Sequence, residues 1–122
     1  MSRLPEALLE HLRAPRNVGP PEGAGEVRSG EARNAACRDH VVLYLARGDD
    51  GRVAGAGFKA HGCPAALGMA SAATELLPGL ALDAGLPDAL RARFVATFGE
   101  PAALHRHALA LVTEAATGAV AG

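Results

Sequence analysis

The sequence predicts an α+β fold, in which helices pack on one face of a three-stranded antiparallel sheet. Residues 26–59 contain three stretches of strand-like composition, and the segments around them show helical spacing or helix boundary signals. Helices that are separated from the strands along the chain in this way collect on one face of the sheet. At 122 residues the chain is long enough for one hydrophobic core, so we expect a single domain over residues 1–122.

The first helix is expected over residues 5–13. Pro5 suits a first helical turn, and Pro15 stops the helix. Its apolar residues recur at helical spacing: Leu4, Ala7, Leu8 and Leu12. A loop rich in proline and glycine follows, and residues 26–32 then form a modest edge strand.

The clearest strand covers residues 40–46, which are rich in β-branched and apolar side chains. The sequence Gly-Asp-Asp-Gly at residues 48–51 is a strong turn signal. Residues 52–59 should therefore return as the antiparallel partner of this strand.

Three helices are expected after the hairpin. The first covers residues 64–77 and ends at Pro78-Gly79, and the second covers residues 87–98. The last covers residues 101–119, with one apolar stripe made of Leu104, Ala108, Leu111 and Ala115.

Charge and hydropathy exclude several kinds of partner. With 12 basic and 13 acidic residues the formal charge is −1, so we expect no binding to nucleic acid or to an anionic membrane surface. Glu6 and Glu10 interrupt the first apolar stretch, so it lacks the core of a signal peptide, and no later run is long enough to span a membrane. We therefore expect a cytoplasmic protein whose two cysteines are reduced.

Hairpin geometry predicts that the two cysteines are neighbours. If the turn is centred near residues 49–51, the numbers of directly opposed residues sum to about 100. Cys37 then lies opposite Cys63, and Asp39 lies opposite His61. Two thiols, a carboxylate and an imidazole would gather at the open end of one ribbon, unless a bulge shifts the pairing.

Cys63 also stands between Gly62 and Pro64, at the expected N-cap of a helix. Free amide groups and the helix dipole favour a thiolate there, so we expect a lowered pKa. Each residue alone has an ordinary explanation: a small buried side chain for Cys37 or Cys63, a carboxylate that holds loop amides for Asp39, and a solvated imidazole for His40 or His61. Their convergence favours a functional site.

Four segments resemble, in order, the motifs of one protein family. HLRAPRNVG (residues 11–19) is similar to H-x-x-x-P-R-N-x-G, NAACRD (34–39) to N-x-x-C-G-D, and FKAHGC (58–63) to F-K-x-x-G-C. Small residues at 70–72, Thr-Glu-Leu at 74–76 and Gly-Leu-Ala-Leu at 79–82 resemble the helix and connection that follow in the family. This is the iron-sulfur cluster assembly scaffold family, which includes IscU, SufU and the N-terminal domain of NifU.

The resemblance implies an IscU/NifU/SufE-like fold and a bound metal ion or iron-sulfur cluster. In the family three cysteines, an aspartate and a histidine surround a zinc ion or a transient [2Fe-2S] cluster. By resemblance Cys37 and Cys63 supply thiolates and Asp39 the carboxylate, for a [2Fe-2S] cluster, Zn²⁺ or Fe²⁺. The implied partners are a cysteine desulfurase, which delivers sulfur, and apo iron-sulfur proteins, which receive the cluster. We expect a scaffold or carrier rather than an enzyme.

The third cysteine is missing. The family begins its last helix with H-C-S or H-C-A, whereas this chain has LHRHALAL at residues 104–111. One alignment makes His105 the family's histidine and Arg106 the replacement for cysteine; the other, which we prefer, uses His107 and Ala108. The two histidines lie roughly 200° apart around a helix, so at most one faces the site.

Other departures leave three functions open. Arg38 replaces the glycine of C-G-D, and GEPAA at residues 99–103 replaces the L-P-P-V-K segment that binds the dedicated chaperone, so we expect no such partner.

The leading hypothesis is a scaffold that uses Cys37, Asp39, Cys63 and His107. The second is a sulfur-transfer partner similar to SufE or zinc-type SufU, with Cys63 as persulfide acceptor. The third is a degenerate, metal-free binding module.

Overall fold

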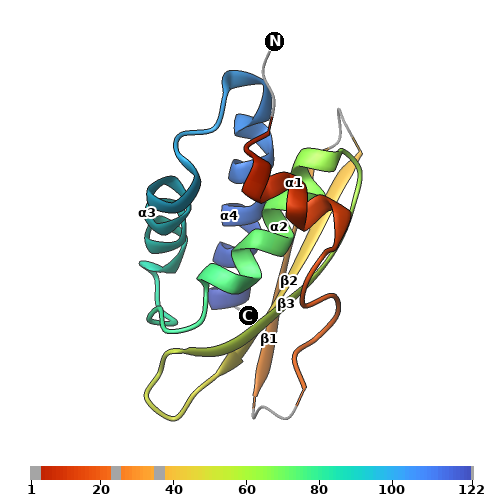
Figure 1. Ribbon diagram of the computed structural model, residues 1–122. Coiled ribbons are helices and arrows are strands. Elements are labelled where there is room, and N and C mark those ends of the chain that lie inside the picture. Colours follow the sequence, from red (N-terminus) through yellow and green to blue (C-terminus); the bar gives the residue numbers. More distant parts are fainter. Residues whose placement is uncertain (1–3, 23–25, 35–37, 122) are drawn as a thin grey trace.

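The computed structural model describes residues 4–22, 26–34 and 38–121, and it confirms the predicted α+β class (Figure 1). Three antiparallel strands form one sheet in the order β1-β2-β3. The helices gather on one side of this sheet, with α1 and α2 crossing in front of it in Figure 1. The elements are α1 (Glu6–Arg13), β1 (Val27–Asn34), β2 (Asp39–Arg47), β3 (Val53–His61), α2 (Pro64–Leu76), α3 (Leu86–Phe98), the 3-10 turn η1 (Ala103–His105) and α4 (Arg106–Ala121).

The core lies between the sheet and the helices. Along β2 the side chains alternate, so Val41, Leu43 and Leu45 are fully buried under α2 and α4. Helix α4 approaches β1 at backbone distance: a β-carbon on Gly30 would overlap the backbone of Ala115 and Ala119. A glycine is therefore needed at this crossing.

The last helix begins later than predicted. The sequence predicts a helix from residue 101, but Ala102 has extended backbone angles of φ −59° and ψ 154°, and α4 starts only at Arg106. Leu104 lies in the intervening turn and is 64% exposed. The prediction that Leu104 belongs to the apolar stripe was therefore wrong. The other stripe residues, Ala108, Leu111 and Ala115, are buried.

The HLRAPRNVG segment covers the free edge of β3. The Gly19 N–H donates to the Phe58 carbonyl at 2.7 Å, and the Phe58 N–H donates to the Asn17 carbonyl at 3.0 Å. Residues 17–19 thus form a short parallel bridge that satisfies the outer N–H and carbonyl groups of Phe58 and protects this part of the edge. Asn17 and Gly19 adopt left-handed backbone angles, with φ of 59° and 89°.

The side chains of the same segment attach it to α2. The buried His11 lies with Nδ1 2.8 Å from Ser71 Oγ and with Nε2 3.1 Å from Glu75. Arg16 donates to both carboxylate oxygens of Glu75, at 3.0 and 2.9 Å. The motif therefore holds α1, α2 and β3 together, a role that the sequence reasoning did not assign.

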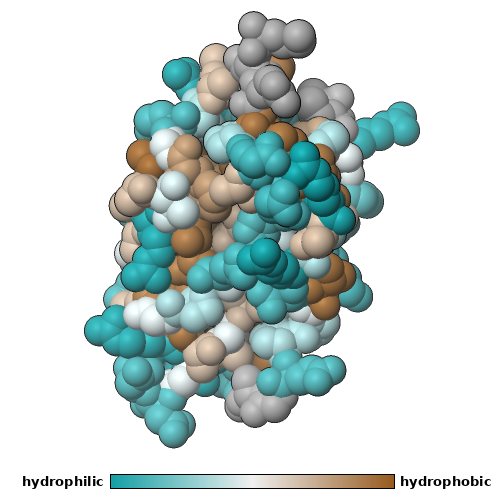
Figure 2. All heavy atoms as spheres, in the orientation of Figure 1, coloured by the Kyte–Doolittle hydropathy of each residue, from teal (hydrophilic) through white to brown (hydrophobic). Residues whose placement is uncertain are grey.

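The two sides of α1 differ in the polarity of their side chains. Figure 2 shows a hydrophilic outer side on α1, whereas apolar side chains reach the surface between α1 and α3. A pocket of about 210 Å³ lies there. Its apolar lining includes Leu4, Leu8, Met69, Phe94 and Phe98.

Among the described helices, each is too short or too polar to cross a bilayer.

Candidate metal centre

Asp39 is the buried anchor of the candidate site. As the first residue of β2 it follows the same alternation as Val41, so its side chain points to the helix-covered side and is 1% exposed. Gly62 lies against it with φ +124°, and a β-carbon there would overlap the carboxylate. The glycine before Cys63 thus provides the space that the carboxylate occupies.

The strand pairing differs by one residue from the predicted register. His40 pairs with His61, because Val53 pairs with Arg47 but Gly55 pairs with Ala46, which leaves one extra residue in β3. The prediction that Asp39 lies opposite His61 was therefore wrong. A shift of one residue moves a side chain to the other face of a sheet, so His61 does not join the buried site.

Cys63 lies at the N-cap of α2, as predicted. Pro64 occupies the first helical turn, and the Ala66 N–H donates to Cys63 Sγ at 3.4 Å. The Cys63 N–H donates to Asp39 Oδ1 at 2.8 Å. The helix start and the first residue of β2 are thereby joined next to the thiol.

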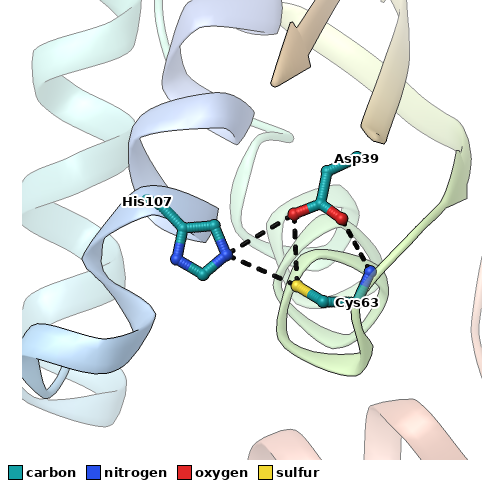
Figure 3. A group of neighbouring side chains, drawn as sticks. All are labelled: Asp39, Cys63 and His107. Carbon is teal, nitrogen blue, oxygen red and sulfur yellow. Dashed lines mark hydrogen bonds and ion pairs between the residues drawn. The ribbon is translucent and has the colours of Figure 1, made fainter. Parts of the chain in front are cut away.

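His107 completes a triangle with these two residues (Figure 3). Cys63 Sγ lies 3.3 Å from Asp39 Oδ2, and His107 Nε2 lies 3.5 Å from the sulfur and 3.4 Å from the same oxygen. Within the described part of the chain, these three residues form the group of histidine, cysteine and acidic side chains whose donor atoms all lie within 4.8 Å of one another.

The two alternative histidines lie in different places. His107 is in the first turn of α4 and faces the Asp39–Cys63 pair, followed by the fully buried Ala108. His105 lies in η1 and lines the apolar pocket between α1 and α3. The preferred alignment, with His107 beside the two predicted ligands, is the one whose residues the fold brings together.

Cys37 lies outside the described residues. Its predicted position opposite Cys63, and its role as a ligand, therefore stay predictions. Arg38, the residue after it, is exposed and has a left-handed φ of 57°. This backbone conformation explains why a glycine suits the same place in the C-G-D motif.

The expected lowering of the Cys63 pKa was wrong. Burial raises the pKa of the thiol, and the neighbouring Asp39 carboxylate raises it further, while the amides of Ala66 and Ala65 act in the opposite direction. The lowering of the Cys63 pKa by the amides at the helix N-terminus is thus outweighed by burial and by the negative charge of Asp39. In the metal-free protein the thiol is protonated at neutral pH and donates to Asp39 Oδ2.

The donor atoms fit one face of a tetrahedral metal site. An ion bound to one thiolate, one imidazole and one carboxylate, at about 2.3, 2.0 and 2.0 Å, holds these donors roughly 3.3–3.6 Å apart. The observed separations are 3.3, 3.5 and 3.4 Å. A cation can therefore replace the shared protons with little movement of the side chains, and its fourth position is left for a further ligand.

Comparisons with known proteins identify the family of the chain. A family model for the NifU-like N-terminal domain matches residues 4–121. The bifunctional protein NifU/MnmA of Rubrobacter xylanophilus is 43% identical over 72 residues, which are 59% of this chain and 14% of that protein. The iron-sulfur cluster assembly scaffold protein IscU of Escherichia coli is 37% identical over 79 residues, which are 64% of this chain and 62% of IscU.

A solved structure shares the fold over nearly the whole chain. The crystal structure of FiSufU, a SUF-system protein from Fervidobacterium islandicum AW-1, superposes with a TM-score of 0.67 over 95% of both chains at 16% identity. At this identity the likeness concerns the fold alone. The match of the family model, which covers almost all of the sequence, shows that this chain belongs to the NifU-like N-terminal domain family.

Proposed function

We propose that this protein is a scaffold or carrier in iron-sulfur cluster assembly. It holds a [2Fe-2S] cluster, or a zinc or iron ion, through Asp39, Cys63 and His107, with Cys37 as the fourth ligand. The observation that supports this most directly is the triangle of three different donor atoms at 3.3–3.5 Å. We also propose that residues 1–122 act as one domain.

The mixed ligand set suits a cargo that must be released. Thiolate and imidazole bind zinc and iron, while a carboxylate oxygen is a weaker and more exchangeable ligand of these clusters. Asp39 is completely buried, but the side chain of His107 is 33% exposed. The cargo would therefore leave through the side of the site that His107 covers.

Partners follow from this assignment. A cysteine desulfurase would supply sulfur, and apo iron-sulfur proteins would accept the assembled cluster. The IscU relative is named as a scaffold protein, which favours this reading over an enzymatic one. The segment at residues 99–103 does not match the chaperone-binding motif, so the dedicated chaperone is not among the proposed partners.

The alternative role as a persulfide acceptor receives less support. Persulfide formation requires a nucleophilic thiolate. The pKa of Cys63 is raised by burial and by Asp39, so the metal-free protein holds little thiolate at this position at neutral pH.

Anaerobic reconstitution with iron and sulfide tests the proposal. The wild-type protein should develop a visible charge-transfer spectrum, which Cys63→Ala and His107→Ala should abolish or weaken strongly. His105→Ala is the matched control, because it removes a nearby histidine that lines a different pocket. A wild-type protein that stays colourless, and that contains no metal when purified without an affinity tag, would refute the proposal and favour the metal-free binding module.

A further inference from the structure

A second group of possible metal ligands lies on the face of the sheet opposite the Asp39–Cys63–His107 centre. His40 on β2 and His61 on β3 are direct register partners, and their ring centres are 5.6 Å apart. Glu31 on β1 places Oε2 3.2 Å from His40 Nε2. His40 thus lies between Glu31 of β1 and His61 of β3 and contacts both.

The alternation of the strand separates this group from the buried centre. Asp39 and His40 are consecutive in β2, so their side chains point to opposite faces. The side chain of His40 is 23% exposed and that of Glu31 57% exposed, and His61 is exposed as well. An ion held by His40 and His61 would therefore reach them from solvent, without passing the Asp39 carboxylate.

We propose that His40 and His61, assisted by Glu31, form a second site for a borderline divalent cation such as Ni²⁺, Cu²⁺ or Zn²⁺. Two imidazoles that share one tetrahedral ion, with nitrogen–metal distances of about 2.0 Å, have their ring centres roughly 5 Å apart. Small side-chain rotations from the observed 5.6 Å reach this separation. The β-ladder fixes the backbones of both residues, so only their side chains have to be ordered on binding.

The donor set selects the class of ion. Imidazole nitrogen binds nickel, copper and zinc, whereas Mg²⁺ and Ca²⁺ need several oxygen ligands. Glu31 contributes a negative charge and orients the His40 ring, as carboxylates commonly do for metal-bound histidines. Two cationic side chains nearby oppose the binding of a metal ion. Arg33 of β1 is the register partner of His40, and Lys59 of β3 is the register partner of Val42, two residues along β2 from His40.

Calorimetric titration of the tag-free protein with Ni²⁺ tests the second site. His61→Ala and His40→Ala should each weaken one binding event at least tenfold, and Glu31→Gln should weaken it by a smaller factor. The same event should persist in His105→Ala, and in a Cys63→Ala/His107→Ala double variant that removes the buried centre. Unchanged binding in His61→Ala, or loss of the event in the double variant, would overturn the proposal.

A spectroscopic measurement on the wild-type protein guards against misfolded variants. Substoichiometric Ni²⁺ is paramagnetic in a site of this kind and should broaden the imidazole NMR signals of His40 and His61 more strongly than those of His105 and of His107. Strongest broadening at His107 would place the ion in the buried centre and count against the second site. Equal broadening of all histidines would show nonspecific binding and refute the site. Failure of cluster reconstitution has no bearing on this result, so the two proposals fail separately.

Discussion

Gly62→Ala tests whether one glycine supports both the fold and the metal centre. Gly62 has φ +124°, and a β-carbon there would overlap the carboxylate and approach Cα of Asp39 at 2.7 Å. The left-handed backbone costs about 1–2 kcal/mol for a residue with a side chain. Displacing Asp39 from the Cys63 N–H removes a charge-assisted hydrogen bond worth about 1.5–3 kcal/mol. We expect a total loss of about 2.5–5 kcal/mol in the free energy of unfolding.

Gly79→Ala is the matched control for this change. Gly79 has φ +93°, but no atom lies within 4 Å of the place where its β-carbon would be. The control should therefore lose only the backbone contribution, about 1–2 kcal/mol. Urea unfolding followed by circular dichroism measures both variants. If Gly62→Ala costs no more than Gly79→Ala, the contact with Asp39 does not constrain the fold and the reasoning is refuted.

The same pair of variants has a second readout. Gly62→Ala should weaken Zn²⁺ binding at least tenfold, because Asp39 leaves the triangle, while Gly79→Ala should bind as the wild type does. Equal Zn²⁺ affinity in the two variants would mean that Asp39 is not a ligand.

Three further predictions concern the backbone and pH. Arg38→Gly should stabilise the protein by about 0.5–1 kcal/mol in urea unfolding, because Arg38 has a left-handed φ of 57°; a loss of stability would show that its side chain matters more. Gly30→Ala should destabilise by at least about 2 kcal/mol, because its β-carbon would force α4 away from β1, and an unchanged urea midpoint would contradict this close approach. Burial lowers the pKa of His11 below 6.5, so the unfolded chain binds the proton more readily and the free energy of unfolding should fall as pH drops below 6.5. His11→Gln should reduce that slope, and an unaltered pH dependence would rule out His11 as its source.

The strands and helices could be predicted because their signals are local. The Gly-Asp-Asp-Gly turn placed the hairpin, and Pro64 and Pro78 marked the ends of α2 to within two residues. Cys63 could be placed at a helix N-cap for the same reason. The preference for His107 came from the family resemblance, because Leu111, Glu114 and Ala115 then fall where the family has a leucine, an acidic residue and an alanine. In the same alignment Ala108 joins the apolar stripe, and Ala108 is indeed buried.

The errors arose where long-range structure decides the outcome. The extra residue in β3 has no signature in the sequence, yet it moved His61 to the other face of the sheet. The pKa of Cys63 depends on burial and on a carboxylate 24 residues away, so the helix start alone misled the prediction. The bonds from residues 17–19 to β3 were equally hidden, because that segment reads as an ordinary loop.

The triangle at the metal centre joins distant parts of the chain. Cys63 is 24 residues from Asp39 and 44 residues from His107, so a bound ion would act as a cross-link between the hairpin and the start of α4. Binding to the folded state alone adds about 2.7 kcal/mol of stability when the free ligand is at 100 times its dissociation constant. The metal-free form would therefore be the less stable one, and the melting temperature of the protein would report whether an ion is bound.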